Sequence, residues 1–146
     1  MAGEDDRRQV FSRVERRFGI SESVFDDYLL FKRKRSWWLL RNTPLLQSAS
    51  RFKVAGIGLR AFQQVGKYVK PSTRMIQMFG HLATKASVEM DEVQLHKLVG
   101  GDPVNAELDM EDGYVILSFE GYILGLGLLI DGRIHSQIPR KELSFS

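Results

Sequence analysis

The sequence predicts an α+β fold, and three features of the chain support that prediction. Apolar residues recur at helical spacing near the start, tight-turn signals separate extended apolar runs over the last 35 residues, and the charge changes sign sharply between segments. A chain of 146 residues suits one compact unit or two small subdomains. We predict an N-terminal α/β subdomain over 1–70 and a second, β-rich domain over 71–146.

An amphipathic helix is predicted over residues 5–18, because four apolar residues recur at three- and four-residue spacing. They are Val10, Phe11, Val14 and Phe18. Gly19 suits the C-terminal cap of this helix, and Ser21 is predicted to cap a short helix that runs to Tyr28. Two strands are predicted next, over 29–33 and 37–41, with their turn at 34–36.

The middle of the chain is predicted to be largely extended. Residues 42–50 fit either a loop or a helical turn after Pro44, a strand is predicted over 52–59, and residues 61–69 continue extended with a turn near Gly66. A helix then begins at Pro71 and Ser72. Its predicted inner side consists of Met75, Ile76, Met78, Phe79 and Leu82.

The second half predicts a short strand over 87–90 and a helix that Asp91 caps and Gly100 ends. Two extended runs, 114–119 and 122–130, flank a turn at 120–121 and predict a hairpin. The second turn signal, at 131–132, leads into a strand over 133–138. The C-terminal segment therefore predicts a β-meander.

The charge of the chain is divided rather than mixed. Residues 28–88 hold twelve Lys and Arg and no acid, whereas residues 89–120 hold nine acids and one base. Like charges repel one another, so such a basic segment is not explained by stability. It predicts a polyanionic partner, most simply the phosphates of RNA or DNA. We expect the acidic band, residues 89–120, to face away from the RNA.

The absence of cysteine excludes disulfides, thiolate zinc sites and cysteine nucleophiles. The first eight residues are polar and charged, and the longest apolar run, 122–130, is about half of what a membrane helix needs. We therefore expect a cytoplasmic protein.

Two stretches resemble known RNA-binding proteins. FKVAGIGLRAFQQVGKYVKPSTRMIQM, residues 52–78, is similar to the segment that opens the C-terminal part of RsmF-type rRNA cytosine-5 methyltransferases. DGYVILSFEGYILGLGLLIDGRIHSQIPRKEL, residues 112–143, resembles the closing pattern of the same proteins, a PUA-like pseudo-barrel. Nip-type ribosome-biogenesis factors share this layout. The resemblance covers roughly residues 10–143.

The resemblance implies an N-terminal α/β subdomain followed by a PUA-like RNA-binding β-barrel. The chain departs from the family in three ways: it has no methyltransferase domain with its glycine loop for S-adenosylmethionine, no catalytic cysteine, and an altered approach to the closing proline, residues 135–138. We therefore expect a stand-alone RNA-binding module without catalysis of its own, and without a cofactor or metal.

The candidate RNA-binding residues fall into three groups, all of them basic. They are Lys32, Arg33, Lys34, Arg35 and Arg60; Lys67, Lys70 and Arg74; and Arg133, His135, Arg140 and Lys141. The resemblance to PUA-like domains favours the last group and the helix after Pro71. We expect bases from the second and third groups to form one continuous face.

Each group also has a structural explanation. The turn 32–35 suits a solvated hairpin tip, and ordinary N-capping accounts for Pro71 and Ser72 beside the three bases. The adjacent tryptophans, Trp37 and Trp38, would face opposite sides of a strand, so that an exposed one could stack on an unpaired base. The alternative is that both pack in the core or at the junction of the subdomains.

Signals for an enzyme are weak. The three histidines are far apart and match no metal-ligand spacing. Four carboxylates suit a solvated face better than a cation site: Glu107, Asp109, Glu111 and Asp112. The glycines at 121, 125 and 127 fit no nucleotide-binding loop and predict tight barrel curvature.

The sequence thus favours a protein that binds rRNA or tRNA in RNA modification or ribosome biogenesis. Its further partner would be a separately encoded RNA-modification enzyme or ribosome-assembly protein. The alternative is a protein-interaction adaptor whose basic segment binds an acidic protein, with Trp37 or Phe62 as the anchor of the interface.

Overall fold

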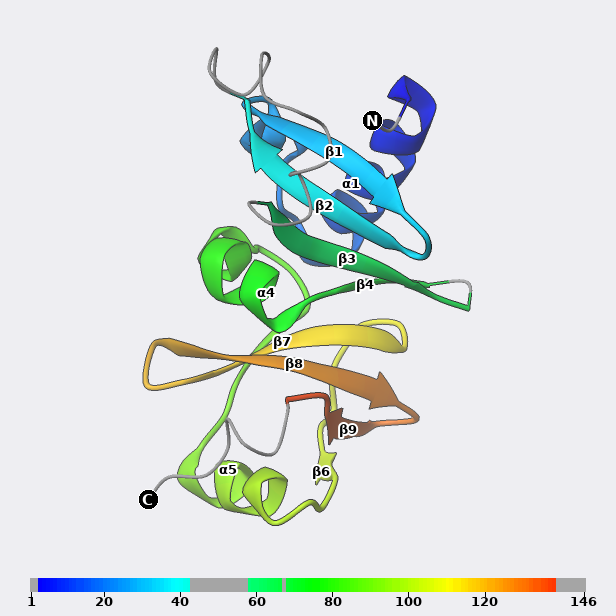
Figure 1. Cartoon of the computed structure of the whole chain (residues 1–146). Helices are drawn as coiled ribbons and strands as arrows, with labels where there is room; N and C mark the ends of the chain where they lie inside the picture. Colours follow the sequence, from blue (N-terminus) through cyan, green and yellow to red (C-terminus); the bar gives the residue numbers. More distant parts are fainter. Residues whose placement is uncertain (1–2, 43–57, 67, 139–146) are drawn as a thin grey trace. The chain divides into compact units, whose positions relative to one another are not determined.

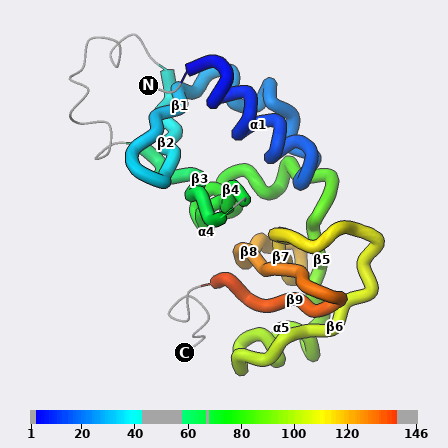
Figure 2. Tube along the Cα trace, turned by 90° about the vertical axis from the view of Figure 1, so that its right-hand side faces the viewer, coloured from blue at the N-terminus to red at the C-terminus, as the bar shows by residue number. Residues whose placement is uncertain are grey.

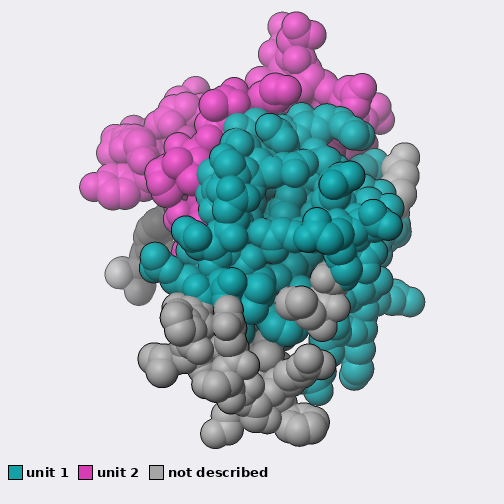
Figure 3. Space-filling view, turned by 90° about the horizontal axis from the view of Figure 1, so that it is seen from above, with its two compact units in different colours: residues 1–75 teal, residues 76–146 magenta. Residues whose placement is uncertain are grey.

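The computed structural model describes residues 3–42, 58–66 and 68–138, and the chain divides into two compact units, Met1–Met75 and Ile76–Ser146 (Figure 3). Each unit combines helices with a β-sheet, so the predicted α+β class is confirmed (Figure 1). Most of the predicted loop over 42–50 and of the predicted strand over 52–59 lies outside the described residues. The assignment of separate roles to 1–70 and 71–146 stays a prediction.

Unit 1 begins with α1 (Glu4–Phe18), which buries the four apolar residues that the periodicity identified. Acidic residues in the first turn and arginines in the last turn complement the helix dipole. Gly19 ends the helix in the left-handed conformation, with φ of 68°, and its N–H donates to the Glu15 carbonyl. The 3₁₀ helix η1 (Glu22–Phe25) follows, capped by the Ser21 hydroxyl, and it ends before Tyr28 because strand β1 begins there.

Four antiparallel strands form the sheet of unit 1 in the order of the chain: β1 (Tyr28–Arg33), β2 (Ser36–Arg41), β3 (Leu59–Val65) and β4 (Tyr68–Pro71). The β1–β2 turn and the β3–β4 turn lie at the same end of the sheet (Figure 1). The Gln64 N–H donates to the Arg35 carbonyl at 2.7 Å and ties the two turns together.

The register divides the side chains of this sheet between two faces, because directly paired residues project to the same side. The buried part of the inner face consists of Leu30, Trp37, Leu39, Phe62 and Pro71. The outer face consists of Leu29, Phe31, Arg33, Ser36, Trp38, Leu40, Arg60, Gln63, Val65, Tyr68 and Lys70. Of these outer-face side chains only Leu40 is buried, and the others are half-buried or exposed.

Helix α1 packs on the inner face (Figure 2). The Phe11 ring stacks on Phe25 with 4.5 Å between centroids and meets Phe62 edge-on at 6.3 Å. Such aromatic contacts add to the stability gained from burying apolar area. The N-terminal helix and the sheet therefore share one core.

The helix after Pro71 is short. α4 (Thr73–Phe79) passes into the 3₁₀ turn η3 (Gly80–Leu82), and it buries Met75, Ile76 and Phe79. The predicted inner positions Met78 and Leu82 are wrong, since these side chains are 49% and 39% exposed. At about 100° per residue Met78 lies outside the buried stripe, and the tighter 3₁₀ turn rotates Leu82 away from it.

Unit 2 is built on a five-stranded sheet in the order β5-β7-β8-β9-β6. The strands are β5 (Ser87–Glu89), β6 (Val104–Asn105), β7 (Gly113–Phe119), β8 (Tyr122–Ile130) and β9 (Arg133–Ser136). The antiparallel run β7-β8-β9 confirms the predicted meander, while the parallel pairing of β5 with β7 was not predicted. Helix α5 (Glu92–Val99) begins with the predicted Asp91 cap, which forms a capping box with Gln94.

Both turns of the meander are two-residue turns with positive φ: Glu120-Gly121 at 49° and 82°, and Asp131-Gly132 at 49° and 77°. This conformation is that of the type I′ turns that suit the twist of a hairpin. Gly127 serves a different purpose, because a Cβ there would lie 2.8 Å from Ile134 Cγ2 and 3.1 Å from Leu117 Cδ1. Gly121 thus belongs to a turn and Gly127 to a close packing contact, while the role of these glycines in barrel curvature stays a prediction. No helix within the described ranges is both long enough and apolar enough to span a membrane.

Candidate nucleic-acid interface

The basic turn 32–35 closes the β1–β2 hairpin, and all four of its side chains are exposed. Lys34 adopts a positive φ of 57°, which confines the turn to Lys34 and Arg35. Strand alternation separates the other two bases: Lys32 Nζ lies 5.3 Å from the centroid of the inner-face Trp37 ring, whereas Arg33 belongs to the outer face. The turn therefore presents its charge to both sides of the sheet.

The two tryptophans separate in the same way. Trp37 is 5% exposed in the core, and its indole N–H finds no hydrogen-bond partner among the described residues. Trp38 is half-buried on the outer face, between Phe31 of β1 and Arg60 of β3. The two tryptophans thus face opposite sides of β2, and the packing of Trp38 at the junction of the subdomains stays a prediction. Phe62, like Trp37, is buried, so neither residue can anchor an interface as the adaptor alternative required.

Arg60 and Lys70 extend the charge of the outer face. Arg60 is exposed and pairs across the strands with Trp38, while Lys70 is half-buried and pairs with Gln63. Lys67, in the β3–β4 turn, lies outside the described residues. Three bases from three strands, Arg33, Arg60 and Lys70, thus belong to one side of the sheet.

The start of α4 supports the capping interpretation. The Ser72 hydroxyl accepts a hydrogen bond from the Met75 N–H at 3.1 Å, which satisfies one of the amides that an anion would use. The helix spans only seven residues, so its dipole is small. Arg74 is exposed beside it, and a contact between Arg74 and phosphate stays a prediction.

The C-terminal group is described in part. Arg133 and His135 are exposed on the same side of β9, with the buried Ile134 between them on the other side. Arg140 and Lys141 lie outside the described residues. The continuous face that would join these bases to Lys70 and Arg74 of unit 1 stays a prediction.

The nine acids of the acidic band, residues 89–120, are all exposed, and several stabilise turns and caps. Glu89 accepts hydrogen bonds from the Ser118 hydroxyl at 2.6 Å and from the Gly121 N–H at 3.2 Å. These two bonds hold the pKa of the Glu89 carboxyl below its ordinary value. Asp112 accepts from the Asp131 N–H at 3.2 Å. The sequence interpretation missed these bonds, because the bonded partners are brought close only by strand pairing.

The carboxylates at 107, 109, 111 and 112 are exposed on unit 2. Across the described ranges, no three His, Cys, Asp or Glu side chains converge as a metal site requires. All four side chains are exposed to solvent, and the expectation that they bind no cation stays a prediction.

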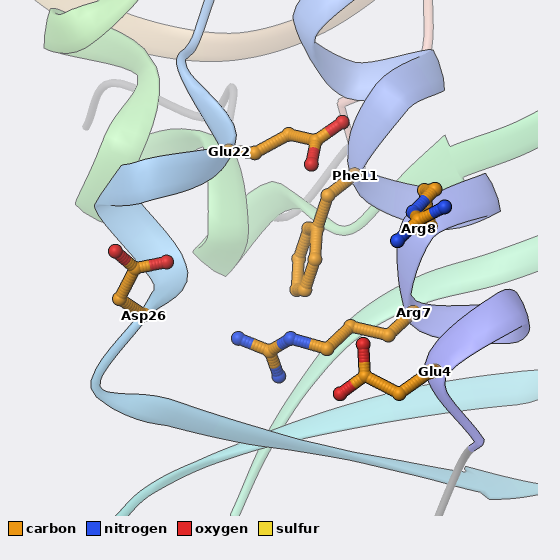
Figure 4. A pocket seen from close by; sticks show the side chains of 6 residues that line it. All are labelled: Glu4, Arg7, Arg8, Phe11, Glu22 and Asp26. Atoms are coloured by element: carbon orange, nitrogen blue, oxygen red, sulfur yellow. The ribbon is translucent and has the colours of Figure 1, made fainter.

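A pocket of about 140 Å³ lies between α1 and η1 in unit 1, lined by Glu4, Arg7, Arg8, Phe11, Glu22 and Asp26 (Figure 4). Arg7 extends from α1 across the pocket, and its guanidinium donates to the carbonyls of Phe25 at 2.5 Å and Tyr28 at 2.7 Å. It also lies 4.9 Å from the Phe11 ring centroid. Arg7 thus fastens α1 to η1 and β1, and this arginine has a structural role.

Most of the chain is similar to part of two curated proteins. The chain is 25% identical over 134 residues to the ribosomal RNA small subunit methyltransferase F of Aeromonas salmonicida (strain A449). The aligned region covers 90% of this chain and 27% of that protein. It is 23% identical over 119 residues to the protein of the same name from Psychromonas ingrahamii, covering 77% of this chain and 24% of that protein. The chain therefore spans about a quarter of the length of these relatives.

One protein-family match covers the five-stranded sheet of unit 2. Residues 85–142 match the family described as the methyltransferase RsmF PUA domain, and this range contains β5 to β9 together with α5. The curled meander and its tight turns are the part of the fold that the sequence resemblance anticipated. Residues 85–142 thus constitute a PUA-like module that resembles the C-terminal domain of the RsmF rRNA methyltransferases.

Proposed function

We propose that this chain binds structured rRNA and acts in rRNA modification or ribosome biogenesis as a stand-alone module, without catalysis of its own. The match of residues 85–142 to the RsmF PUA domain carries the proposal, since it supports RNA binding in an rRNA-modification context. The basic segment, residues 28–88, supplies the charge that phosphate binding requires. Basic side chains would replace counterions on the phosphates, and the shape of the RNA would select the target.

The role that follows is to hold RNA for a separately encoded modification enzyme or ribosome-assembly protein in the cytoplasm. The exposed acids of the acidic band would face away from the RNA. Small-subunit rRNA is the first probe, because the relatives are named for it. Transfer RNA is the second probe.

Salt dependence tests this proposal. Fluorescence anisotropy should report binding of labelled small-subunit rRNA fragments, and log affinity should fall linearly with log salt with a slope equivalent to several phosphates. Arg74→Ala combined with Arg140→Ala should lower that slope by about two if each side chain contacts one phosphate. Affinity that is flat from low to moderate salt would contradict RNA binding through these bases.

The absence of catalysis has a separate test. Incubation of the purified chain with rRNA and radiolabelled S-adenosylmethionine should give no methyl incorporation, because the chain has no cysteine nucleophile and no glycine loop for the methyl donor. Incorporation by the chain alone would contradict this part of the proposal and leave RNA binding intact.

A further inference from the structure

We propose that the outer face of the four-stranded sheet is a binding surface for single-stranded RNA, separate from the PUA-like module. Unpaired bases would stack on Trp38 and Tyr68, and Arg33, Arg60 and Lys70 would contact the phosphates. This inference rests on the RNA binding proposed above, and it names a surface and a class of RNA that the family match does not supply.

Strand register places these residues together. Phe31, Trp38 and Arg60 form one row across β1, β2 and β3, since Trp38 pairs with each of the other two. The adjacent row runs across all four strands as Arg33, Ser36, Gln63 and Lys70. Neighbouring strands are about 4.8 Å apart and alternate residues about 6.7 Å apart, so both rows belong to a compact patch.

Tyr68 completes the patch at the turn end of the sheet. It pairs with Val65, two residues along the strands from the Gln63–Lys70 pair, so it projects from the same outer face. Tyr68 is 40% exposed, and Trp38 is half-buried, so each can offer part of a ring to a base. The sequence interpretation did not include Tyr68, because its place on the same face as Trp38 depends on the register of β3 against β2 and β4.

Charge and shape favour RNA over an acidic protein as the occupant. The patch contains three bases and no acid, and the strands that form it lie within the acid-free residues 28–88. A sheet surface with aromatic side chains among basic ones is a known arrangement for stacking unpaired bases, because each base offers a flat π-face. Gln63 adds an exposed amide that can hydrogen-bond to base edges.

The opposite face gives a matched control. The inner face of the sheet is covered by α1. Arg16, exposed on that helix, therefore serves as a control for a basic side chain outside the patch. Tyr122, at the β7–β8 turn of unit 2, is 76% exposed and represents an exposed tyrosine outside the patch.

Tryptophan fluorescence gives a direct readout. The chain has two tryptophans, so Trp37→Phe leaves Trp38 as the single emitter. This change also removes a buried N–H that has no partner among the described residues, so we expect the variant to fold. An unlabelled single-stranded octanucleotide should quench Trp38 emission on binding, and a duplex of the same length should quench it much less.

Affinity for the octanucleotide should depend on the presence of an aromatic ring at position 68. Tyr68→Ala should weaken binding about tenfold, as expected for one lost stacking contact, while Tyr68→Phe should bind like the wild type. Arg33→Ala and Arg60→Ala should each weaken binding, whereas Tyr122→Ala and Arg16→Ala should not. Far-UV circular dichroism of every variant establishes that the fold is retained.

The outcomes separate this inference from the proposed function. If the chain binds small-subunit rRNA fragments but Trp38 emission is unquenched and Tyr68→Ala binds the octanucleotide normally, the outer-face surface is wrong and RNA binding stands. If the chain binds neither RNA, both proposals fail. Equal losses from Tyr68→Ala and Tyr122→Ala would also overturn the outer-face surface, since the effect would not be specific to it.

Discussion

Replacement of Gly127 by alanine tests whether the meander owes its tight packing to a missing side chain. Gly127 lies in the middle of β8 and pairs with Val115 on one side and Ser136 on the other. An added Cβ would lie 2.8 Å from Ile134 Cγ2 and 3.1 and 3.3 Å from the two Leu117 methyl groups. Both neighbours are fully buried, so neither can swing into solvent.

The expected magnitude follows from two opposed effects. Overpacking of a buried site costs about 1–3 kcal/mol, and replacing glycine in a strand by alanine returns about 0.5–1 kcal/mol through lower backbone entropy in the unfolded chain. We therefore expect Gly127→Ala to lower the free energy of unfolding by about 1–2 kcal/mol. Urea denaturation followed by far-UV circular dichroism measures this change.

Gly100→Ala is the matched control. Gly100 caps α5 with φ of −75°, and the nearest atoms to an added Cβ are backbone carbonyl oxygens at 3.5 and 3.6 Å, which is ordinary contact. We expect this variant to stay within about 0.5 kcal/mol of the wild type. Equal stability of Gly127→Ala and the wild type, or equal losses in both variants, would refute the packing argument.

Two further predictions concern interactions that the fold brings together. Arg7→Met should lower the free energy of unfolding by about 1.5–3 kcal/mol, since the guanidinium bonds to the Phe25 and Tyr28 carbonyls are lost, and urea denaturation checks it. Equal stability of Arg7→Met and the wild type would contradict it. The hydrogen bonds from the Ser118 hydroxyl and the Gly121 N–H hold the pKa of the Glu89 carboxyl below 4.5 in the folded state. The ionised carboxylate therefore contributes fully to the stability of the fold well above pH 4.5, and this contribution is lost as the pH falls through 4.5 toward the lower pKa of the folded state. Glu89→Gln should flatten the loss of melting temperature over that acidic range, and an unchanged acid profile would show that this carboxylate does not contribute.

The sequence could predict the elements whose signals are local. The α1 stripe, the Gly19 cap, the Asp91 cap and the turns at 120–121 and 131–132 depend on residues a few positions apart, and the structure has each of them. Leu82 was placed wrongly because helical periodicity holds only while the helix continues, and α4 tightens after seven residues. Met78 was placed wrongly because, within α4, its angle at about 100° per residue lies outside the buried stripe.

Long-range pairing could not be predicted from these patterns. The parallel pairing of β5 with β7 joins segments more than twenty residues apart, and no local signal specifies it. The roles of Glu89 and Arg7 depend on such contacts in the same way, since an exposed acid and a helical arginine have no sequence feature that marks a distant partner. Candidate side chains can therefore be chosen by type from the sequence, while their grouping requires the register.

The basic segment illustrates how charge and register combine. Its composition predicts attraction to phosphate but not the surface that receives it, because alternation along each strand sends neighbouring residues to opposite faces. Lys32 is thus directed toward Trp37 on the inner face, and Arg33 shares the outer face with Arg60. A run of bases that looks continuous in the sequence is consequently divided in two. The bases that share a face with Trp38 lie beside an aromatic ring, so this face combines groups that attract phosphates with a ring on which a base can stack.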